Sequence, residues 1–356
     1  MKHYFIVNPK SGKNVKFDVL NDYILPAVKK TGVDYEIYET KCAGDGQRFV
    51  KETCEALAGE PARFYAVGGD GTLYEVVNGA FGYENAEVTV VPKGSGNDWI
   101  RLFGDQPMFL DVEGLINGTP IKVDAIKVTH ENGTEIALNQ TSMGFDAEAC
   151  IEQGRMKAVP GAIGHVTYLL AGLYCAITRT TFDFDVKIDG KPMDMSPYCF
   201  VVGCNSRWYG SGIKVAPFAD PQDHLMDIVM YRRVTSWPVL FKVAMLNWQV
   251  KGDHWKRPYV EIIRGKTLEI TDNRPIEKKR AINVDGECQR VDGCKLELVD
   301  DGITFVIPQA STYLADRENG NLTFEIEKTI FNKEPLKTLL TKYEPYHVLF
   351  HKKYRK

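Results

Sequence analysis

Residues 63–72 read Arg-Phe-Tyr-Ala-Val-Gly-Gly-Asp-Gly-Thr, an apolar strand that ends in a glycine-rich turn. Apolar residues recur at helical spacing over residues 73–80, so the turn opens a helix. Glycines allow a tight turn and a close approach to a ligand, and the N–H groups at a helix start favour an anion. In an open α/β sheet, ligands bind where the strands end. The turn therefore predicts a site for a phosphate-bearing ligand.

Asp70 is unusual in such a turn, because its carboxylate would repel a phosphate. A Mg²⁺ ion between the two groups would remove that repulsion. Two further small-residue turns follow the predicted strands 5–7 and 88–91, and they read Asn8-Pro9-Lys10-Ser11-Gly12-Lys13 and Pro92-Lys93-Gly94-Ser95-Gly96-Asn97-Asp98. Three turns at one sheet edge would converge on one ligand. A purely structural role for the turns is the alternative.

The first third of the chain alternates strand-like and helix-like segments. Strands are expected at 5–7, 35–38, 63–67 and 88–91, and helices at 17–28, 49–57 and 73–80, with Gly32 ending the first helix. This alternation predicts an α/β N-terminal domain of Rossmann-like type, with a mainly parallel sheet and helices on both faces.

From about residue 123 the pattern changes to short apolar alternations. Turn signals separate them at 131–133, 188–191, 284–286 and 292–293. Such spacing predicts antiparallel hairpins and hence a β-rich, sandwich-like second domain. We place the domain boundary near residue 122 and regard residues 311–356 as a C-terminal extension.

Composition limits the partners and the compartment. A net charge of −3 gives no reason to expect a nucleic acid as partner. None of the eight cysteines forms a C-x-x-C pair, which argues against a zinc ribbon and indicates reduced thiols in a cytoplasmic protein. The longest apolar run, 166–177, is shorter than the roughly 20 residues that span a bilayer. It predicts a core helix, or else one wall of a cleft for an acyl chain.

Residues 328–356 carry eight Lys or Arg against two Glu, with apolar residues interleaved. This composition suits the surface of an anionic bilayer, so peripheral contact at the inner face of the membrane is one interpretation. A helix packed on its own protein with solvated lysines is the other. The oligomeric state is left open, a homodimer included.

Several common motifs are absent. A Walker A loop around Gly12 would need Gly and Ser or Thr where Val7 and Asn14 stand, and the loop ending at 265–267 fails in the same way at Val260. There is no G-x-G-x-x-G, G-x-S-x-G or H-E-x-x-H. The signatures of dinucleotide enzymes, α/β-hydrolases and zincins are therefore missing.

The three turns together resemble the diacylglycerol kinase catalytic family, which includes bacterial lipid kinases and sphingosine and ceramide kinases. The family pattern N-P-x-S-G matches residues 8–12, G-G-D-G-T-x-N-E-V-x-N-G matches 68–79, and P-x-G-T-x-N-D matches 92–98. Ala216-Pro217 with Asp223 and Asp227 matches a fourth motif, and V-D-G-E matches residues 284–287. These five motifs occur in the family's order over residues 5–308.

The resemblance implies a fold of the NAD kinase and diacylglycerol kinase type. In such a fold residues 1–122 bind ATP, residues 123–289 carry the rest of the site, and the chain returns to the first domain at 290–310. The residues expected at the nucleotide are Asn8, Pro9, Lys10, Ser11, Gly12, Thr40, Gly68, Gly69, Asp70, Gly71, Thr72, Leu73, Tyr74 and Ser95. Thr40 is included because residues 40–45 are similar to the family's T-x-x-x-G-D/H.

The resemblance also implies the catalytic and metal groups. Glu287 would be the general base, and Asp124 matches a carboxylate near the phosphates. Asp220 and Leu225, through their carbonyl groups, and Asp223, through its carboxylate, would hold a structural Mg²⁺.

Three positions depart from the family's pattern. Tyr74 puts a phenol where the pattern has Asn, which would alter contacts with the base or ribose. Ser95 keeps the hydroxyl of the usual Thr. His224 replaces a Gly, which is costly if that position has a positive φ.

The sequence therefore predicts an ATP- and Mg²⁺-dependent kinase that phosphorylates a hydroxyl of a diacylglycerol-like lipid at a membrane surface. A kinase of a soluble acceptor such as NAD is one alternative, which the V-D-G-E motif and the basic tail oppose. A catalytically silent nucleotide-binding regulator is another. Tyr74 and His224 would favour the silent regulator, whereas Asp70 and Glu287 oppose it.

Overall fold

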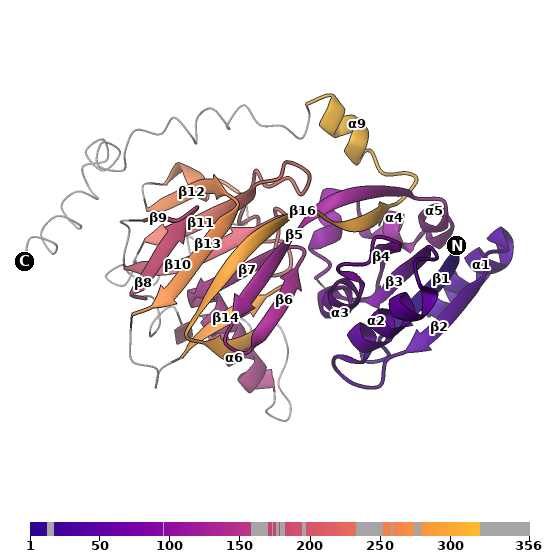
Figure 1. Ribbon diagram of the computed structural model, residues 1–356, viewed down its shortest axis with the longest axis horizontal. Coiled ribbons are helices and arrows are strands. Elements are labelled where there is room, and N and C mark those ends of the chain that lie inside the picture. The colour runs from indigo at the N-terminus through magenta and orange to yellow at the C-terminus, as the bar shows by residue number, and fades with distance from the viewer. Residues whose placement is uncertain are drawn as a thin grey trace, which may run out of the picture.

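The computed structural model describes residues 1–12, 18–94, 96–157, 170–172, 174–175, 178, 182–193, 197–232, 252–257, 259–273 and 279–320. They form an α/β unit and a β-sandwich, seen side by side in Figure 1. The two units share a ten-stranded sheet, in which the order β2-β1-β3-β4-β16-β13-β8-β9 runs from the first unit into the second. Both the parallel N-terminal sheet and the β-rich second domain that the sequence predicts are confirmed.

The α/β unit is built on four parallel strands: β1 (Lys2–Val7), β2 (Tyr35–Glu39), β3 (Ala62–Gly68) and β4 (Ala86–Pro92). Its helices are α1 (Leu25–Thr31), α2 (Asp45–Leu57), α3 (Asp70–Ala80), α4 (Gln106–Leu110) and α5 (Val112–Ile116). A π-helical turn (Val19–Ile24) leads into α1, and a 3-10 turn (Trp99–Leu102) precedes α4. Figure 1 shows α2 and α3 packed together against this sheet.

Local chemistry sets the ends of these helices. Helix α1 stops at Gly32, whose φ of 69° is left-handed, as the sequence predicts. Helix α2 begins four residues before the predicted start at 49. The reason lies in α3, because the Glu75 carboxylate accepts the N–H groups of Gly44 and Gly46 at 2.8 and 2.9 Å. A side chain from a neighbouring helix thus caps α2, and no local pattern could show this.

The sandwich consists of antiparallel strands in two layers. One layer continues the ten-stranded sheet with β5 (Thr119–His130), β6 (Gly133–Ala137), β8 (Phe184–Ile188), β9 (Lys191–Pro192), β13 (Thr267–Asp272) and β16 (Gly293–Ile307). The other has the order β12-β11-β10-β7-β14-β15, with β7 (Gln140–Gly144), β10 (Tyr198–Cys204), β11 (Met226–Arg232), β12 (Val260–Gly265), β14 (Arg280–Val284) and β15 (Glu287–Val291). Helix α6 (Phe145–Lys157) follows β7, a 3-10 turn (His254–Lys256) precedes β12, and α9 (Tyr313–Glu318) comes last.

Three of the four predicted hairpin turns are hairpins: β5–β6, β8–β9 and β14–β15. The fourth prediction, at 292–293, is wrong. β15 pairs with β14 in one layer, whereas β16 pairs with β13 and β5 in the other. The Asp-Gly turn signal is real, but here it carries the chain across the sandwich. Apolar residues on both strands face the shared core, and burying them decides between the two outcomes.

Two long strands join the units. β5 and β16 pair with each other along most of their length, with an irregularity between Val299 and Ile303. The far end of β16 lies parallel to β4, and Phe305 there is fully buried. The predicted boundary near 122 falls inside β5. Because one strand pair serves both units, a continuous sheet runs from one to the other.

The buried apolar side chains form three clusters. One lies around the parallel sheet, one between the two layers of the sandwich, and one on the outer face of the six-stranded sheet. In the described part of the chain no helix is long and apolar enough to cross a membrane. Most of the run 166–177, and all of 328–356, lie outside the described residues.

Candidate active site

The three glycine-rich turns meet at the carboxyl ends of β1, β3 and β4, as predicted. Asn8, after β1, donates through Nδ2 to Thr72 Oγ1 at 3.3 Å. Gly94, after β4, donates its N–H to the Gly68 carbonyl at 3.1 Å. A Cβ on Gly94 would lie 2.6 Å from Gly69 Cα, so only glycine allows the two turns to approach this closely. Thr40, after β2, donates its N–H to the Val7 carbonyl at 2.9 Å and lies at the same edge.

Asp70 opens α3 and connects two of the turns. Its carboxylate accepts the N–H groups of Asn97 and Asp98 at 2.9 and 3.0 Å. Burial, and after it the nearby Asp98 carboxylate, raises the pKa of Asp70 to about 6. Burial also raises the pKa of Asp98, although Arg101 and the Ser211 N–H bind it. Two adjacent carboxylates at this helix terminus concentrate negative charge, although all four of their oxygens already accept hydrogen bonds, one of them from Arg101.

Glu287 faces this edge from the other unit. Its Oε1 lies 3.2 Å from where a Cβ on Gly71 would stand, in the first turn of α3. Thus the two motifs, 216 residues apart in sequence, lie in contact. Desolvation, followed by the carboxylates of Glu75 and Glu135, raises the pKa of Glu287. An elevated pKa suits a carboxylate that has to accept a proton.

Asp285 holds the hairpin that presents Glu287. It has a φ of 49° and Gly286 a φ of 100°, so both turn residues are left-handed, as a tight two-residue hairpin requires. The Asp285 carboxylate accepts the N–H groups of Leu138 and Gln140 at 2.6 and 2.7 Å, and that of Asn139 at 3.1 Å. These bonds fasten the turn to the start of β7. The base therefore stands on a fixed support.

The Asp124 carboxylate is directed to the loop 220–225. It is fully buried and accepts three hydrogen bonds at 2.9 Å: from His224 N–H, from His224 Nδ1 and from the Asp301 N–H. Among the described residues, one side-chain ligand atom from each of Asp124, His224 and Asp301 lies within 4.8 Å of the other two, a spacing that could hold a metal ion. All of the side-chain bonds of Asp124 go to this group. Its predicted place near the phosphates remains a prediction.

The carboxylates in and just after the loop 220–225 form ion pairs with arginines. Asp223 lies 3.1 Å from Arg264 Nη1, and Asp227 lies 2.8 Å from Arg264 Nε. Asp220 accepts from Arg317 Nε and from the Tyr313 hydroxyl, both at 3.0 Å.

Both oxygens of Asp223 are engaged, one by Arg264 and the other by the Leu225 N–H at 3.0 Å. The Asp220 carbonyl accepts the Asp223 N–H at 3.3 Å. Mg²⁺ needs oxygens that are open to octahedral coordination. In this arrangement the residues expected to hold a structural Mg²⁺ do not fit the ion, because arginines supply the positive charge.

The remaining predicted nucleotide residues divide into two groups. Lys10, Ser11 and Gly12 lie on the exposed turn after β1, whereas Thr72 and Leu73 are buried in α3. Ser95 lies outside the described residues.

Tyr74 is half-buried, and its hydroxyl donates to Glu135 on β6 at 2.8 Å. Asp98, Asp285 and Glu135 are not among the site residues predicted from the sequence. The motifs contain Asp98 and Asp285, but nothing local indicates the carboxylate of Glu135.

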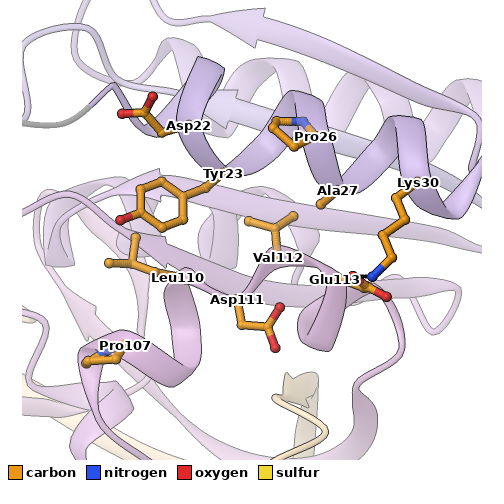
Figure 2. Close-up of a pocket in the computed structure, with 10 residues that line it drawn as sticks. All are labelled: Asp22, Tyr23, Pro26, Ala27, Lys30, Pro107, Leu110, Asp111, Val112 and Glu113. Carbon is orange, nitrogen blue, oxygen red and sulfur yellow. Dashed lines mark hydrogen bonds and ion pairs between the residues drawn. The ribbon is translucent and has the colours of Figure 1, made fainter.

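A groove of about 490 Å³ lies elsewhere, between α1 and the pair α4–α5. Figure 2 shows Tyr23, Leu110 and Val112 lining it, with Lys30 meeting Glu113 at one end. Their Nζ–Oε2 distance is 2.7 Å. None of the motif residues lines this groove, so its size carries no functional argument.

Two family models match the chain in sequence. The diacylglycerol kinase catalytic domain matches residues 2–128, and the YegS C-terminal NAD kinase beta sandwich-like domain matches residues 139–306. The chain belongs to the diacylglycerol kinase catalytic-domain family.

Individual relatives match most of the chain. A diacylglycerol kinase of Bacillus subtilis is 24% identical over 287 residues, covering 79% of this chain and 88% of the relative. One of Staphylococcus carnosus is 26% identical over 285 residues, covering 79% and 87%. The crystal structure of a diacylglycerol kinase from Bacillus anthracis matches with a TM-score of 0.62 at 19% identity, over 87% of this chain and 97% of that one. The last likeness concerns the fold alone.

Proposed function

We propose that this protein is an ATP-dependent lipid kinase, which transfers the γ-phosphate of ATP to a hydroxyl of a diacylglycerol-like lipid at a membrane surface. The carrying observation is the contact of Glu287 with the first turn of α3, where three glycine-rich turns meet. This contact supports the assignment of Glu287 as a base beside a phosphate-binding turn. The names of the relatives, diacylglycerol kinases among them, support the choice of a lipid acceptor.

The reaction that this geometry supports is a direct transfer. The acceptor oxygen forms a bond with the γ-phosphorus while the bond from the γ-phosphorus to the bridging oxygen breaks, and ADP leaves with the electron pair. Glu287 takes the proton of the hydroxyl. Phosphoryl transfer depends mainly on positioning and on neutralising charge, and the convergence of the turns supports both.

A Mg²⁺ ion bound with the triphosphate would neutralise charge on the phosphoryl oxygens. Asp70 and Asp98 bring two carboxylates to this sheet edge, and because their oxygens already accept hydrogen bonds they would act on the ion through its bound water. Asp70 also fixes the turn after β4, through the N–H groups of Asn97 and Asp98. Its replacement by Ala should therefore weaken nucleotide binding by loosening the turn as well as by losing charge.

The decisive variant is Glu287→Gln. It keeps the size of the side chain but cannot accept the proton, so we expect turnover to fall at least about 100-fold while ATP affinity is retained. Incubation with γ-labelled ATP and mixed lipids, followed by identification of the lipid that gains phosphate, measures turnover and names the acceptor. An unchanged rate would remove Glu287 from the base role. Transfer of label to NAD, with no labelled lipid, would overturn the lipid assignment.

The wild-type rate should also depend on pH. Glu287 works as the carboxylate, and its pKa is raised, so the rate should fall as the pH drops through a value above the ordinary glutamate range. In Glu287→Gln this acid limb should disappear.

A further inference from the structure

The phenol of Tyr74 takes part in a hydrogen-bonded chain between the two units. Tyr74 lies on α3, one turn beyond Gly71, where the family's pattern has Asn. Its hydroxyl donates to Glu135 Oε2 at 2.8 Å, and its ring packs against the core of the sandwich. A side chain of the α/β unit thus contacts residues of the second unit.

The chain continues from Glu135 to the strand that carries the base. The other oxygen of Glu135 accepts from Gln289 Nε2 and lies 3.1 Å from His130 Nε2. The Gln289 amide oxygen accepts from Asn132 Nδ2 at 2.8 Å. Gln289 is two residues after Glu287 on β15, so both side chains point to the same face of the strand.

Among the strands that the structure describes, β15 is at the edge of its sheet and pairs with β14 alone, so a further support matters for its position. On one side of Glu287 the hairpin is fastened by Asp285 to β7. On the other side Gln289 is fastened to the β5–β6 hairpin. Glu287 therefore lies between two fixed residues, Asp285 and Gln289. Tyr74 connects Gln289, through Glu135, to α3, the helix whose first turn Glu287 contacts.

We propose that Tyr74, Glu135 and Gln289 are positioning residues that fix Glu287 relative to the start of α3. This inference rests on the proposed role of Glu287 as the base. The phenol spans the distance between the units, which the shorter amide of Asn would not. An error of about 1 Å in the placement of a base can cost about 100-fold in rate, so such a connection matters for turnover.

Tyr74, Glu135 and Gln289 together are called the clamp. The clamp also brings negative charge close to Glu287. The carboxylates of Glu75 on α3 and Glu135 on β6 act on Glu287, and the Tyr74 phenol and the His130 ring bind Glu135. The negative charge of Glu135 opposes ionisation of Glu287. Replacing Glu135 by Gln removes this charge and keeps one oxygen for Tyr74, but it turns an N–H toward Gln289. Tyr74→Phe instead keeps the charge and removes the phenol's hydrogen bond, so comparing the two variants separates charge from contact.

The test compares Tyr74→Phe and Glu135→Gln with Tyr83→Phe. Tyr83 also donates its hydroxyl to a glutamate, Glu55, at 3.0 Å, but on the exposed surface, so it controls for the loss of such a bond. We expect Tyr74→Phe to lower kcat about tenfold with the KM for ATP unchanged. In Glu135→Gln the acid limb of kcat should move to lower pH. Tyr83→Phe should match the wild type in both.

A second measurement does not depend on the acceptor. In protein labelled with ¹³C at glutamate carboxyls, Glu287 is assigned by its loss in Glu287→Gln and is then titrated. Its pKa should fall in Glu135→Gln and stay constant in Tyr83→Phe. This result in a protein that phosphorylates no lipid would support the clamp and reject the proposed function. A kcat, pH profile and titration of Tyr74→Phe and Glu135→Gln equal to those of Tyr83→Phe would overturn the clamp.

Discussion

At the scale of single residues, the candidate site depends on carboxylates that do different work. Glu287 is exposed beside Gly71, whereas the Asp285 carboxylate is bound by three backbone N–H groups. Burial raises the pKa of Asp285 to about 7, while these N–H groups favour its charged form. The sequence shows only two acids of a V-D-G-E motif. Their division into a support and a candidate base comes from what each side chain contacts.

We therefore predict that Asp285→Asn impairs both stability and turnover. The amide would turn an N–H toward backbone N–H groups, so at least one donor loses its acceptor, at a cost of about 1–3 kcal/mol. Thermal unfolding and the rate of lipid phosphorylation measure the two effects.

Asp189 provides a matched control for Asp285. It is a left-handed residue of the Asp-Gly turn between β8 and β9 and accepts the N–H groups of Lys266 and Thr267, both at 2.9 Å. Asp189→Asn should destabilise the protein by a similar amount and leave kcat unchanged. If both substitutions lowered kcat equally, Asp285 would have no specific role in supporting Glu287.

At the scale of elements, the loop 220–225 shows how one replacement is accommodated. His224 has a φ of 59°, in the left-handed region that favours the family's Gly. Its N–H and Nδ1 both bind Asp124, at 2.9 Å. Asp124 and Asp301 also raise the pKa of His224, with Asp124 the main cause. The backbone strain is thus offset by contacts that glycine could not make in full.

This predicts different effects of two small residues at this position. Both His224→Ala and His224→Gly lose the ring contact with Asp124, but only Gly relieves the left-handed strain. We expect the glycine variant to be more stable than the alanine variant by about 1 kcal/mol. Chemical denaturation of the two proteins checks this. An alanine variant as stable as the glycine variant would show that the loop relaxes out of the left-handed conformation.

At the scale of the whole molecule, the proposed membrane contact concerns the basic segment 328–356. Its charge should act through anionic lipid headgroups, at about 1 kcal/mol for each basic residue near the surface. Replacing Lys352, Lys353, Arg355 and Lys356 by Glu should weaken sedimentation with phosphatidylglycerol vesicles. Activity on a short-chain, dispersed diacylglycerol should stay constant.

A control for this variant replaces Lys29 and Lys51, two exposed lysines on α1 and α2, by Glu. Vesicle binding should then be unaffected. Unchanged binding after the tail substitutions would contradict the membrane role of the segment. An equal loss in both variants would attribute binding to net charge alone.

The sequence by itself determined the α/β alternation, the β-rich second half and the three turns, because each is written in local periodicity and in glycine positions. It also identified Asp70 and Glu287 as candidates through their motifs. Tertiary structure alone brought Glu287 over Gly71, turned 292–293 into a crossing between layers, and let Glu75 set the start of α2. It also joined Tyr74 to Glu135 and paired Asp223 with Arg264. These contacts join residues between 29 and 216 positions apart, and their partners are chosen by burial and by the demands of buried charge, which no local pattern records.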